Sequence, residues 1–139
     1  MRLLVDTNVY LDLILKRDKG YVSSLKFFLW CKKNKNQNYI TSMSLRDIEY
    51  IAQKTFHDKT KSHKVLADIY TLCTKVIGIS SDAAINAIYE DYKDFEDELL
   101  IQSAKENLMD AIITNNKKDY KDSSIPVFSP DEVISLLAC

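Results

Sequence analysis

The first residues of the chain combine a short apolar run with an acid that ends it. The run at residues 3–5 is followed at once by Asp6, and a second apolar stretch begins at Val9. An apolar run that is broken by polar residues and followed by helical periodicity is typical of a buried strand leading into a helix. Asp6 is therefore expected at the carboxyl end of a strand, where open α/β sheets bind ligands. A charge in that position is costly unless it is paired or coordinates a cation.

The rest of the sequence alternates short apolar runs with amphipathic segments. Strands are predicted at residues 2–6, 39–41, 76–79, 111–114 and 125–128, and helices at 8–16, 21–33, 42–56, 64–73, 82–90, 94–108 and from 129 onwards. Residues 57–63 are predicted to form a polar turn. Strands that alternate with helices predict a mostly parallel sheet with helices on both faces, a three-layer α/β/α fold. At 139 residues the chain is long enough for a single domain, 1–139.

Composition narrows the class of protein. Hydrophobic residues make up 46% of the chain and charged residues 28%, which is ordinary for a soluble globular protein. No apolar run approaches the roughly 20 residues of a membrane-spanning helix, and Asp6 comes too early for a signal peptide, so a cytoplasmic protein without membrane contact is expected. Cys31, Cys73 and Cys139 form no CxxC pair, which disfavours a zinc site or a disulfide framework. The net charge of −1 gives no overall basic field, although it does not exclude nucleic-acid binding.

Two of the predicted helices carry acids beside their buried faces. In the helix at 42–56, Asp47 borders the apolar stripe on one side and Glu49 on the other, so periodicity does not choose between them. In the helix that follows Asp94, Asp97 falls on the core-facing stripe, which is unusual for a charge. Acids are also favoured in the first turn of a helix, and a capping role explains Asp94 better than it explains Asp97.

A further group of polar side chains follows the strand that ends at Thr114. Asn115, Asn116 and Asp119 come just after it, and in a parallel sheet they lie on the same edge as Asp6. These residue types are also common in turns. Several carboxylates cannot share a pocket without protons or cations, and oxygen ligands of this kind select Mg²⁺ or Mn²⁺. One or two such ions activate water and stabilise charge on a phosphate, so the sequence indicates phosphodiester hydrolysis.

Four segments occur in an order that resembles a PIN domain, in particular the VapC-type ribonuclease toxins and related small bacterial PIN proteins. They are Leu-Leu-Val-Asp-Thr-Asn at 3–8, Ile-Thr-Ser-Met-Ser-Leu-Arg-Asp-Ile at 40–48, Asp-Phe-Glu-Asp at 94–97 and Ile-Ile-Thr-Asn-Asn-Lys-Lys-Asp-Tyr at 112–120. The resemblance covers nearly the whole chain. It implies an endonuclease that cuts RNA with Mg²⁺ or Mn²⁺, acts as a homodimer and, in toxin pairs, is silenced by a cognate antitoxin that blocks the acidic site.

Carried over by position, the resemblance implies catalytic and metal-binding roles for Asp6, Asp47 and Asp97. It favours Asp47 over Glu49, although the family often has glutamate where Asp47 stands. The family's fourth acid often follows the strand where this chain has Asn116, and Asp119 would compensate for the missing charge. The wider set of expected ligands therefore includes Asp94, Asn116 and Asp119, and the groups expected to support the ligands or contact phosphate are Thr7, Asn8 and Thr114.

Two questions stay open at the level of the sequence. A basic loop around His57 and His63 either holds an RNA backbone or is a solvated turn, and its lysines are Lys54, Lys59, Lys61 and Lys64. Asn116, together with Asp47 in place of glutamate, also suits a PIN-like module that binds RNA or protein without cutting. A phosphatase or phospho-acceptor domain is disfavoured, because Asn8 stands where the haloacid-dehalogenase-like Asp-x-Asp pattern needs a second acid.

Overall fold

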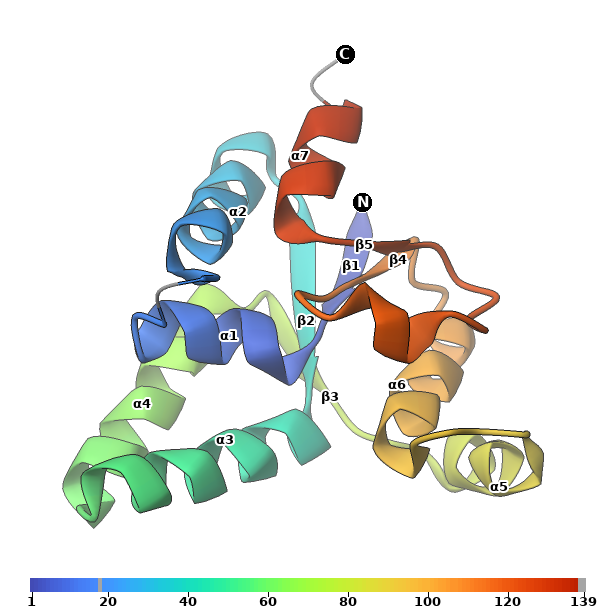
Figure 1. Cartoon of the computed structure of the whole chain (residues 1–139), viewed down its shortest axis with the longest axis horizontal. Coiled ribbons are helices and arrows are strands. Elements are labelled where there is room, and N and C mark those ends of the chain that lie inside the picture. Colours follow the sequence, from blue (N-terminus) through green and yellow to red (C-terminus); the bar gives the residue numbers. More distant parts are fainter. Residues whose placement is uncertain (18, 138–139) are drawn as a thin grey trace.

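The computed structural model describes residues 1–17 and 19–137, and a five-stranded sheet lies at its centre (Figure 1). The strands are β1 (Arg2–Val5), β2 (Gln37–Thr41), β3 (Lys75–Ile77), β4 (Ala111–Ile113) and β5 (Val127–Phe128), in the spatial order β3-β2-β1-β4-β5. All neighbouring pairs are parallel. β1 therefore lies between β2 and β4, where the direction of strand addition reverses. Open α/β sheets bind ligands at the carboxyl ends of the strands beside such a reversal.

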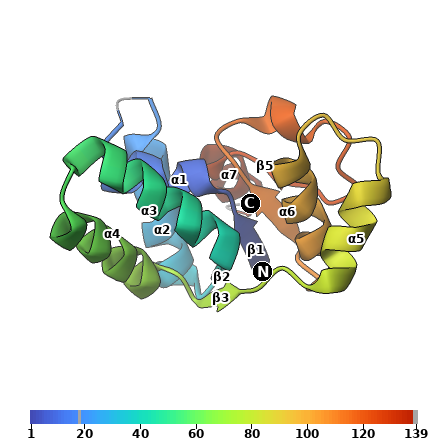
Figure 2. The ribbon, with the colours of Figure 1, turned by 90° about the horizontal axis from the view of Figure 1, so that it is seen from below.

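Helices cover both faces of the sheet. They are α1 (Thr7–Ile14), α2 (Tyr21–Asn34), α3 (Ser42–Phe56), α4 (Lys59–Leu72), α5 (Ser81–Tyr89), α6 (Phe95–Glu106) and α7 (Pro130–Leu137), and a 3-10 turn, η1, spans Lys117–Tyr120. Helices α1 to α4 lie on one side of the sheet with α7, and α5 and α6 lie on the other (Figure 2). The predicted three-layer α/β/α fold is confirmed. None of the described helices is both long and apolar enough to cross a membrane.

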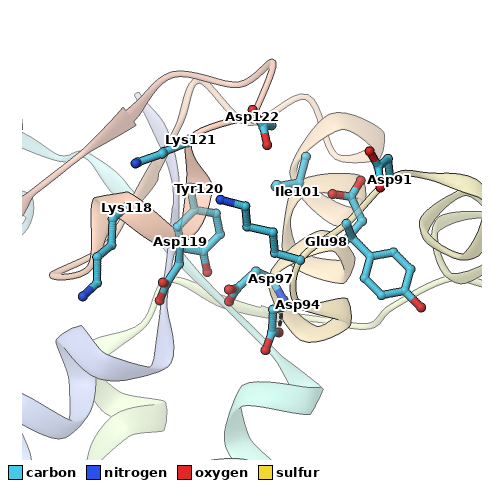
Figure 3. Close-up of a pocket in the computed structure, with 12 residues that line it drawn as sticks. Asp91, Asp94, Asp97, Glu98, Ile101, Lys118, Asp119, Tyr120, Lys121 and Asp122 are labelled. Carbon is cyan, nitrogen blue, oxygen red and sulfur yellow. Dashed lines mark hydrogen bonds between the residues drawn. The ribbon is translucent and has the colours of Figure 1, made fainter.

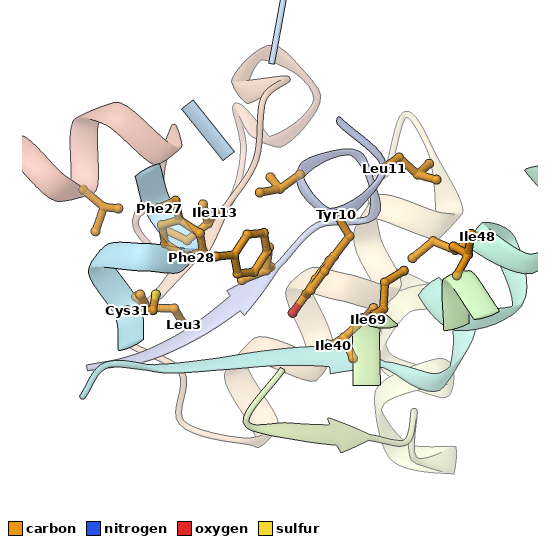
Figure 4. Packing of buried hydrophobic residues seen from close by; sticks show 14 of the residues in the cluster. Leu3, Tyr10, Leu11, Phe27, Phe28, Cys31, Ile40, Ile48, Ile69 and Ile113 are labelled. Carbon is orange, nitrogen blue, oxygen red and sulfur yellow. The ribbon is translucent and has the colours of Figure 1, made fainter. Parts of the chain in front are cut away.

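The two faces of the sheet carry separate hydrophobic cores, because successive residues of a strand point in opposite directions. Leu3 and Val5 belong to the larger core, and Leu4 between them belongs to the smaller core beneath α6. In the larger core the ring centroids of Tyr10 and Phe28 lie 5.0 Å apart (Figure 4). Burial on both faces explains the continuous apolar run that begins the chain.

Side-chain caps mark the starts of several helices, among them α1, α3 and α6. Asp6 caps α1, Thr41 caps α3 and Asp94 caps α6, each by accepting a backbone N–H of the first turn. Such caps satisfy N–H groups that the helix itself leaves without partners. Since β1 leads into α1 and β2 leads into α3 with no intervening loop, the first turns of both helices lie at the carboxyl edge of the sheet.

The polar turn predicted at 57–63 is wrong, because most of that segment is helical. The side chain of Asp58 accepts hydrogen bonds from the backbone N–H groups of Thr60 and Lys61, and α4 therefore begins at Lys59. His57, with a φ of 50°, links α3 to α4. The lysines expected on a loop lie on helices instead: Lys54 on α3, and Lys59, Lys61 and Lys64 on α4.

Gly20, just before α2, leaves room for a buried acid of α1. A Cβ at Gly20 would lie 1.9 Å from Asp12 Oδ2 and 2.9 Å from Asp12 Cβ. Asp12 also holds the loop after β4, because Asn115 donates its side-chain N–H to Asp12 Oδ2 at 2.5 Å. On the other side, Arg17 Nη1 lies 3.8 Å from Asp12 Oδ1. The absence of a side chain at Gly20 thus helps to position the loop that carries part of the acidic edge.

Gly20→Ala is expected to lower the free energy of unfolding by about 1–3 kcal/mol, because overpacking of a well-packed site forces neighbouring groups to move. The clash includes Asp12 Cβ, so rotation of the carboxylate does not remove it. Gly78→Ala is the matched control, since a Cβ there meets no atom within 4 Å. Urea unfolding of both variants and the unchanged protein measures the difference, and equal stability of the two variants would contradict this packing.

Candidate functional site

Asp6 stands at the end of β1 with both carboxylate oxygens bound by the protein. Its Oδ1 accepts a hydrogen bond from Thr7 N at 2.8 Å, and its Oδ2 accepts from Thr114 Oγ1 at 2.9 Å and from Asn8 Nδ2 at 3.2 Å. Burial raises the pKa of Asp6, and the hydrogen bonds from Thr114 and Thr7 are among those that oppose the rise. These donors hold the carboxylate in place at the centre of the sheet edge.

Asn8 and Thr114 tie the ends of the two central strands together. Asn8 Nδ2 donates to Thr114 Oγ1 at 3.2 Å, and Asn8 Oδ1 accepts from Asn115 N at 3.0 Å. Thr114 Oγ1 also accepts from Asn116 N at 3.0 Å. Both side chains therefore act on the site through Asp6 and through the loop after β4.

That loop presents Asp119 to the other acids. The side-chain amide of Asn116 donates a hydrogen bond to Asp119 Oδ2. The negative charge of Asp119 contributes to the raised pKa of Asp6 and of Asp97. Of the two candidates for the fourth position, Asp119 is thus the one that faces the acids, and Asn116 orients it.

Asp97 faces the same group from the first turn of α6. Its pKa is raised to about 7, first by burial and then by the negative charges of Asp94, Asp6 and Asp119. Asp94, Asp97 and Asp119 line one hollow (Figure 3). Asp94 Oδ1 accepts a hydrogen bond from Asp97 N at 3.1 Å, so Asp94 both caps α6 and adds charge to the hollow.

Asp47 approaches this edge through Glu96, which precedes Asp97 on α6. The pKa of Glu96 is raised to about 7, first by burial and then by hydrogen bonding with Asp47 and by its charge. Asp47 Oδ2 is buried and has no hydrogen-bond partner of normal geometry within residues 1–17 and 19–137. Its Oδ1 lies 3.7 Å from Arg46 Nη1. The first turns of α3 and α6 thus bring a second pair of acids to the edge.

Glu49, the alternative that periodicity left open, is engaged elsewhere. Its Oε1 accepts a hydrogen bond from Gln53 Nε2 at 2.9 Å, one turn further along α3. Asp47 is therefore the acid of α3 that interacts with α6. Sequence reasoning missed Glu96, because it lies off the core-facing stripe of its helix and only the approach of α3 gives it a partner.

The carboxylate oxygens of these acids are of the type that binds a hard divalent cation. The acids do not, however, converge on one point. Across the described part of the chain, no three His, Cys, Asp or Glu side chains converge closely enough to hold one ion. Asp6 lies with Asp97 and Asp119, and Asp47 lies with Glu96, while the charge of Asp97 also raises the pKa of Glu96. Mutual repulsion keeps carboxylates apart, and a divalent cation reverses that effect. Their all-oxygen donor set suits Mg²⁺ or Mn²⁺.

Three lysines that sequence reasoning missed line the same hollow as the acids. They are Lys93, Lys118 and Lys121. None of the three forms an ion pair with a residue that the structure describes. Because Lys93 lies before α6 and the other two lie in or after η1, only the folded chain brings them together.

The lysines expected to contact RNA lie in the last turn of α3 and on α4. Lys64 pairs with Asp68 at 3.1 Å, and Lys61 lies over the ring of Phe56. Phe56 ends α3, and at 1.5 Å per residue it lies about 13 Å further along the helix axis than Asp47. A contact between these lysines and RNA stays a prediction.

Comparison with known proteins supports the same fold. A family model described as PIN domain matches residues 2–118. The chain is similar to VapBC2 from Rickettsia felis bound to a DNA fragment from their promoter, with a TM-score of 0.72 and 20% identity over 93% of this chain and 98% of that one. It is also similar to DNA-bound VapBC from Salmonella typhimurium, with a TM-score of 0.71 and 16% identity over 94% of this chain and 98% of that one. With VapC20 of Mycobacterium tuberculosis, a sarcin-ricin loop cleaving toxin, the TM-score is 0.62 and the identity 15%, over 79% of this chain and 86% of that one. No curated protein matches the chain.

In the presence of a chelator, the stability of the protein is expected to fall as the pH rises through 7. Asp97 has a pKa of about 7 in the folded protein and Glu96 also has one of about 7, both above the usual values. The stability that their protons supply is complete below the unfolded pKa and is lost as the pH rises through the folded pKa. Urea midpoints between pH 5 and pH 8.5 measure the fall.

Asp97→Asn should make this pH dependence shallower, because an amide does not titrate. Asp68→Asn is the control, since Asp68 lies on α4 and pairs with Lys64 away from these acids. An Asp97→Asn variant with the pH dependence of the unchanged protein would show that Asp97 is not the titrating group.

Proposed function

Because the chain belongs to the PIN domain family, we propose that it is a metal-dependent endoribonuclease that hydrolyses RNA phosphodiester bonds in the cytoplasm. The observation that carries the proposal is the gathering of acids at the carboxyl edge of the sheet, where the pKa values of Asp6 and Asp97 are both raised. Carboxylates in such surroundings favour a proton or a cation. Oxygen ligands suit Mg²⁺ or Mn²⁺, as one ion or two.

Asp6, Asp47 and Asp97 are the proposed principal ligands, with Asp119 as the fourth acid. Asp94 and Asn116 are proposed as supporting groups next to these ligands. When bound, a divalent ion lowers the pKa of water and stabilises the charge that develops on the phosphate. The residues of the chain itself orient the carboxylates that would bind the ion. Thr114, Asn8 and the backbone of Thr7 hold Asp6, and Asn116 holds Asp119.

A toxin role in a type II toxin–antitoxin pair is part of this proposal. The solved structures with the same fold include VapBC complexes from two organisms and a toxin that cleaves the sarcin-ricin loop. By analogy of fold, we expect a homodimer and a cognate antitoxin that covers the acidic edge. A short reading frame beside the gene, encoding a DNA-binding fold with an extended tail, would support this part of the proposal.

Asp6→Asn is expected to lower Mn²⁺-dependent RNA cleavage by at least about 100-fold, because it removes a charge from the centre of the ligand set and loss of a supporting group alone costs about 10–100-fold. Asp68→Asn is the control for a general effect of losing one carboxylate. Cleavage of a labelled RNA by purified protein measures both. Full metal-dependent cleavage by the Asp6→Asn variant would contradict the assignment of Asp6 as a metal ligand.

Changing both Lys118 and Lys121 to alanine is expected to lower kcat/KM for RNA by about 10-fold at low salt and to reduce the steepness of the salt dependence. Both lysines line the acidic hollow and have no ion pair with a described residue, so they are available for phosphates. The matched control changes Lys59 and Lys61 on α4. A larger loss in the α4 variant would show that RNA runs over α4, as the sequence suggested.

A second candidate function, a PIN-like module that binds RNA or protein without cutting, is favoured by two observations. No three of the described acids converge on a common point, and the uncharged Asn116 stands after β4. Calorimetric titration with Mn²⁺ separates the two functions. Binding at micromolar to millimolar Mn²⁺ supports the nuclease, and no binding at millimolar Mn²⁺ supports the module.

A further inference from the structure

Tyr120 brings a buried hydroxyl group from the smaller core to the acids. It ends η1, is only 3% exposed, and its side chain belongs to the smaller core with Leu4, Leu100 and Ile112. The ring thus fixes where the hydroxyl lies. Figure 3 shows that this oxygen is directed towards the carboxylates that line the hollow, with Asp97 beside it.

The hydroxyl of Tyr120 is buried without a hydrogen bond of normal geometry to any residue of 1–17 and 19–137. It nevertheless lies beside Asp97 (Figure 3), and the nearness of Tyr120 lowers the pKa of both Asp6 and Asp97. A buried hydroxyl without a full partner destabilises the folded protein, and a phenylalanine ring would fill the same space without that cost. Packing therefore explains the ring of Tyr120 but not its oxygen.

The two carboxylates differ in how they are held. Asp6 accepts hydrogen bonds from Thr7, Thr114 and Asn8. For Asp97, Tyr120 favours the charged form of the carboxylate. The negative charges of Asp94, Asp6 and Asp119 all disfavour that form. Repulsion of this kind disfavours the charged form of a carboxylate. A neutral donor beside Asp97 offsets part of that effect.

We propose that Tyr120 is a positioning residue, whose hydroxyl donates to one oxygen of Asp97 and leaves the other oxygen directed towards Asp6, so that the two carboxylates can share a divalent cation. A phenol is a neutral hydrogen-bond donor, so Tyr120 supports one oxygen of Asp97 without adding charge to the hollow. Carboxylate ligands of metals are themselves held by such hydrogen bonds, and loss of one typically weakens metal binding. The inference rests on the proposed metal-dependent function.

The test compares Tyr120→Phe with the unchanged protein in two measurements, Mn²⁺ affinity by calorimetry and the thermal midpoint of unfolding in a chelator. Mn²⁺ affinity is expected to fall about 10–100-fold, because Asp97 loses its donor. The midpoint in chelator is expected to stay or to rise, because a buried hydroxyl without a full partner has been removed. A merely structural role would not separate the two measurements in this way.

Tyr39→Phe is the matched control, because it removes another buried phenol oxygen. Tyr39 is 4% exposed, its hydroxyl donates to Gln37 Oε1 at 2.9 Å, and it accepts from Arg2 Nη1 at 3.0 Å. Its loss breaks satisfied hydrogen bonds away from the acids. The Tyr39→Phe variant should therefore have a lower thermal midpoint and an unchanged Mn²⁺ affinity, the opposite of Tyr120→Phe.

The possible results separate this inference from the proposed function. An unchanged Mn²⁺ affinity in Tyr120→Phe, while the unchanged protein binds Mn²⁺, overturns the role of Tyr120 alone. A loss of affinity that comes with a lowered midpoint in chelator also overturns it, since the effect is then general destabilisation. If the unchanged protein binds no Mn²⁺ at millimolar concentration, the inference and the proposed nuclease fail together.

Discussion

The carboxylate of Asp6 is the interaction on which the rest of the site depends. One of its oxygens caps α1, and the other accepts hydrogen bonds from the side chains of Thr114, just after β4, and Asn8 of α1. A single acid therefore joins the two central strands to the first helix, at the point where the order of strands reverses. Because the strands beneath it are buried on both faces, the charge stands on a rigid base.

Around this fixed charge, the site balances repulsion between acids against a few donors. Asp6 has donors enough to stay ordered, whereas Asp97 and Glu96 have raised pKa values that reflect burial and like charges. Such an arrangement costs stability in the metal-free protein, which is common where a site is prepared for a ligand. The buried hydroxyl of Tyr120 adds to this loss of stability and orients Asp97. A bound cation would offset the loss.

Local patterns predicted the parts of the structure that depend on local physics. The strand end at Asp6, the cap at Asp94 and the half-buried place of Asp97 follow from apolar runs and helical periodicity within a few residues. The wrong turn at 57–63 came from reading a polar stretch as a loop, because the cap at Asp58 was not recognised.

What the sequence could not supply depends on contacts between distant segments. Glu96 interacts with Asp47 of α3. The hydroxyl of Tyr120 reaches the acids because its ring packs in the core with residues of α6. Lys93 and Lys118 line the same hollow only in the folded chain. Periodicity describes one element at a time, so it places a residue on a face but does not say what that face meets. The choice between Asp47 and Glu49 was open for the same reason.

Anomalous diffraction from a crystal of the protein soaked in Mn²⁺ locates any bound ion directly. An anomalous peak is expected at the carboxyl edge of the sheet, within bonding distance of both Asp6 and Asp97 and next to the hydroxyl of Tyr120. A peak bound by other residues, or acids that stay apart with no peak between them at saturating Mn²⁺, would contradict this expectation.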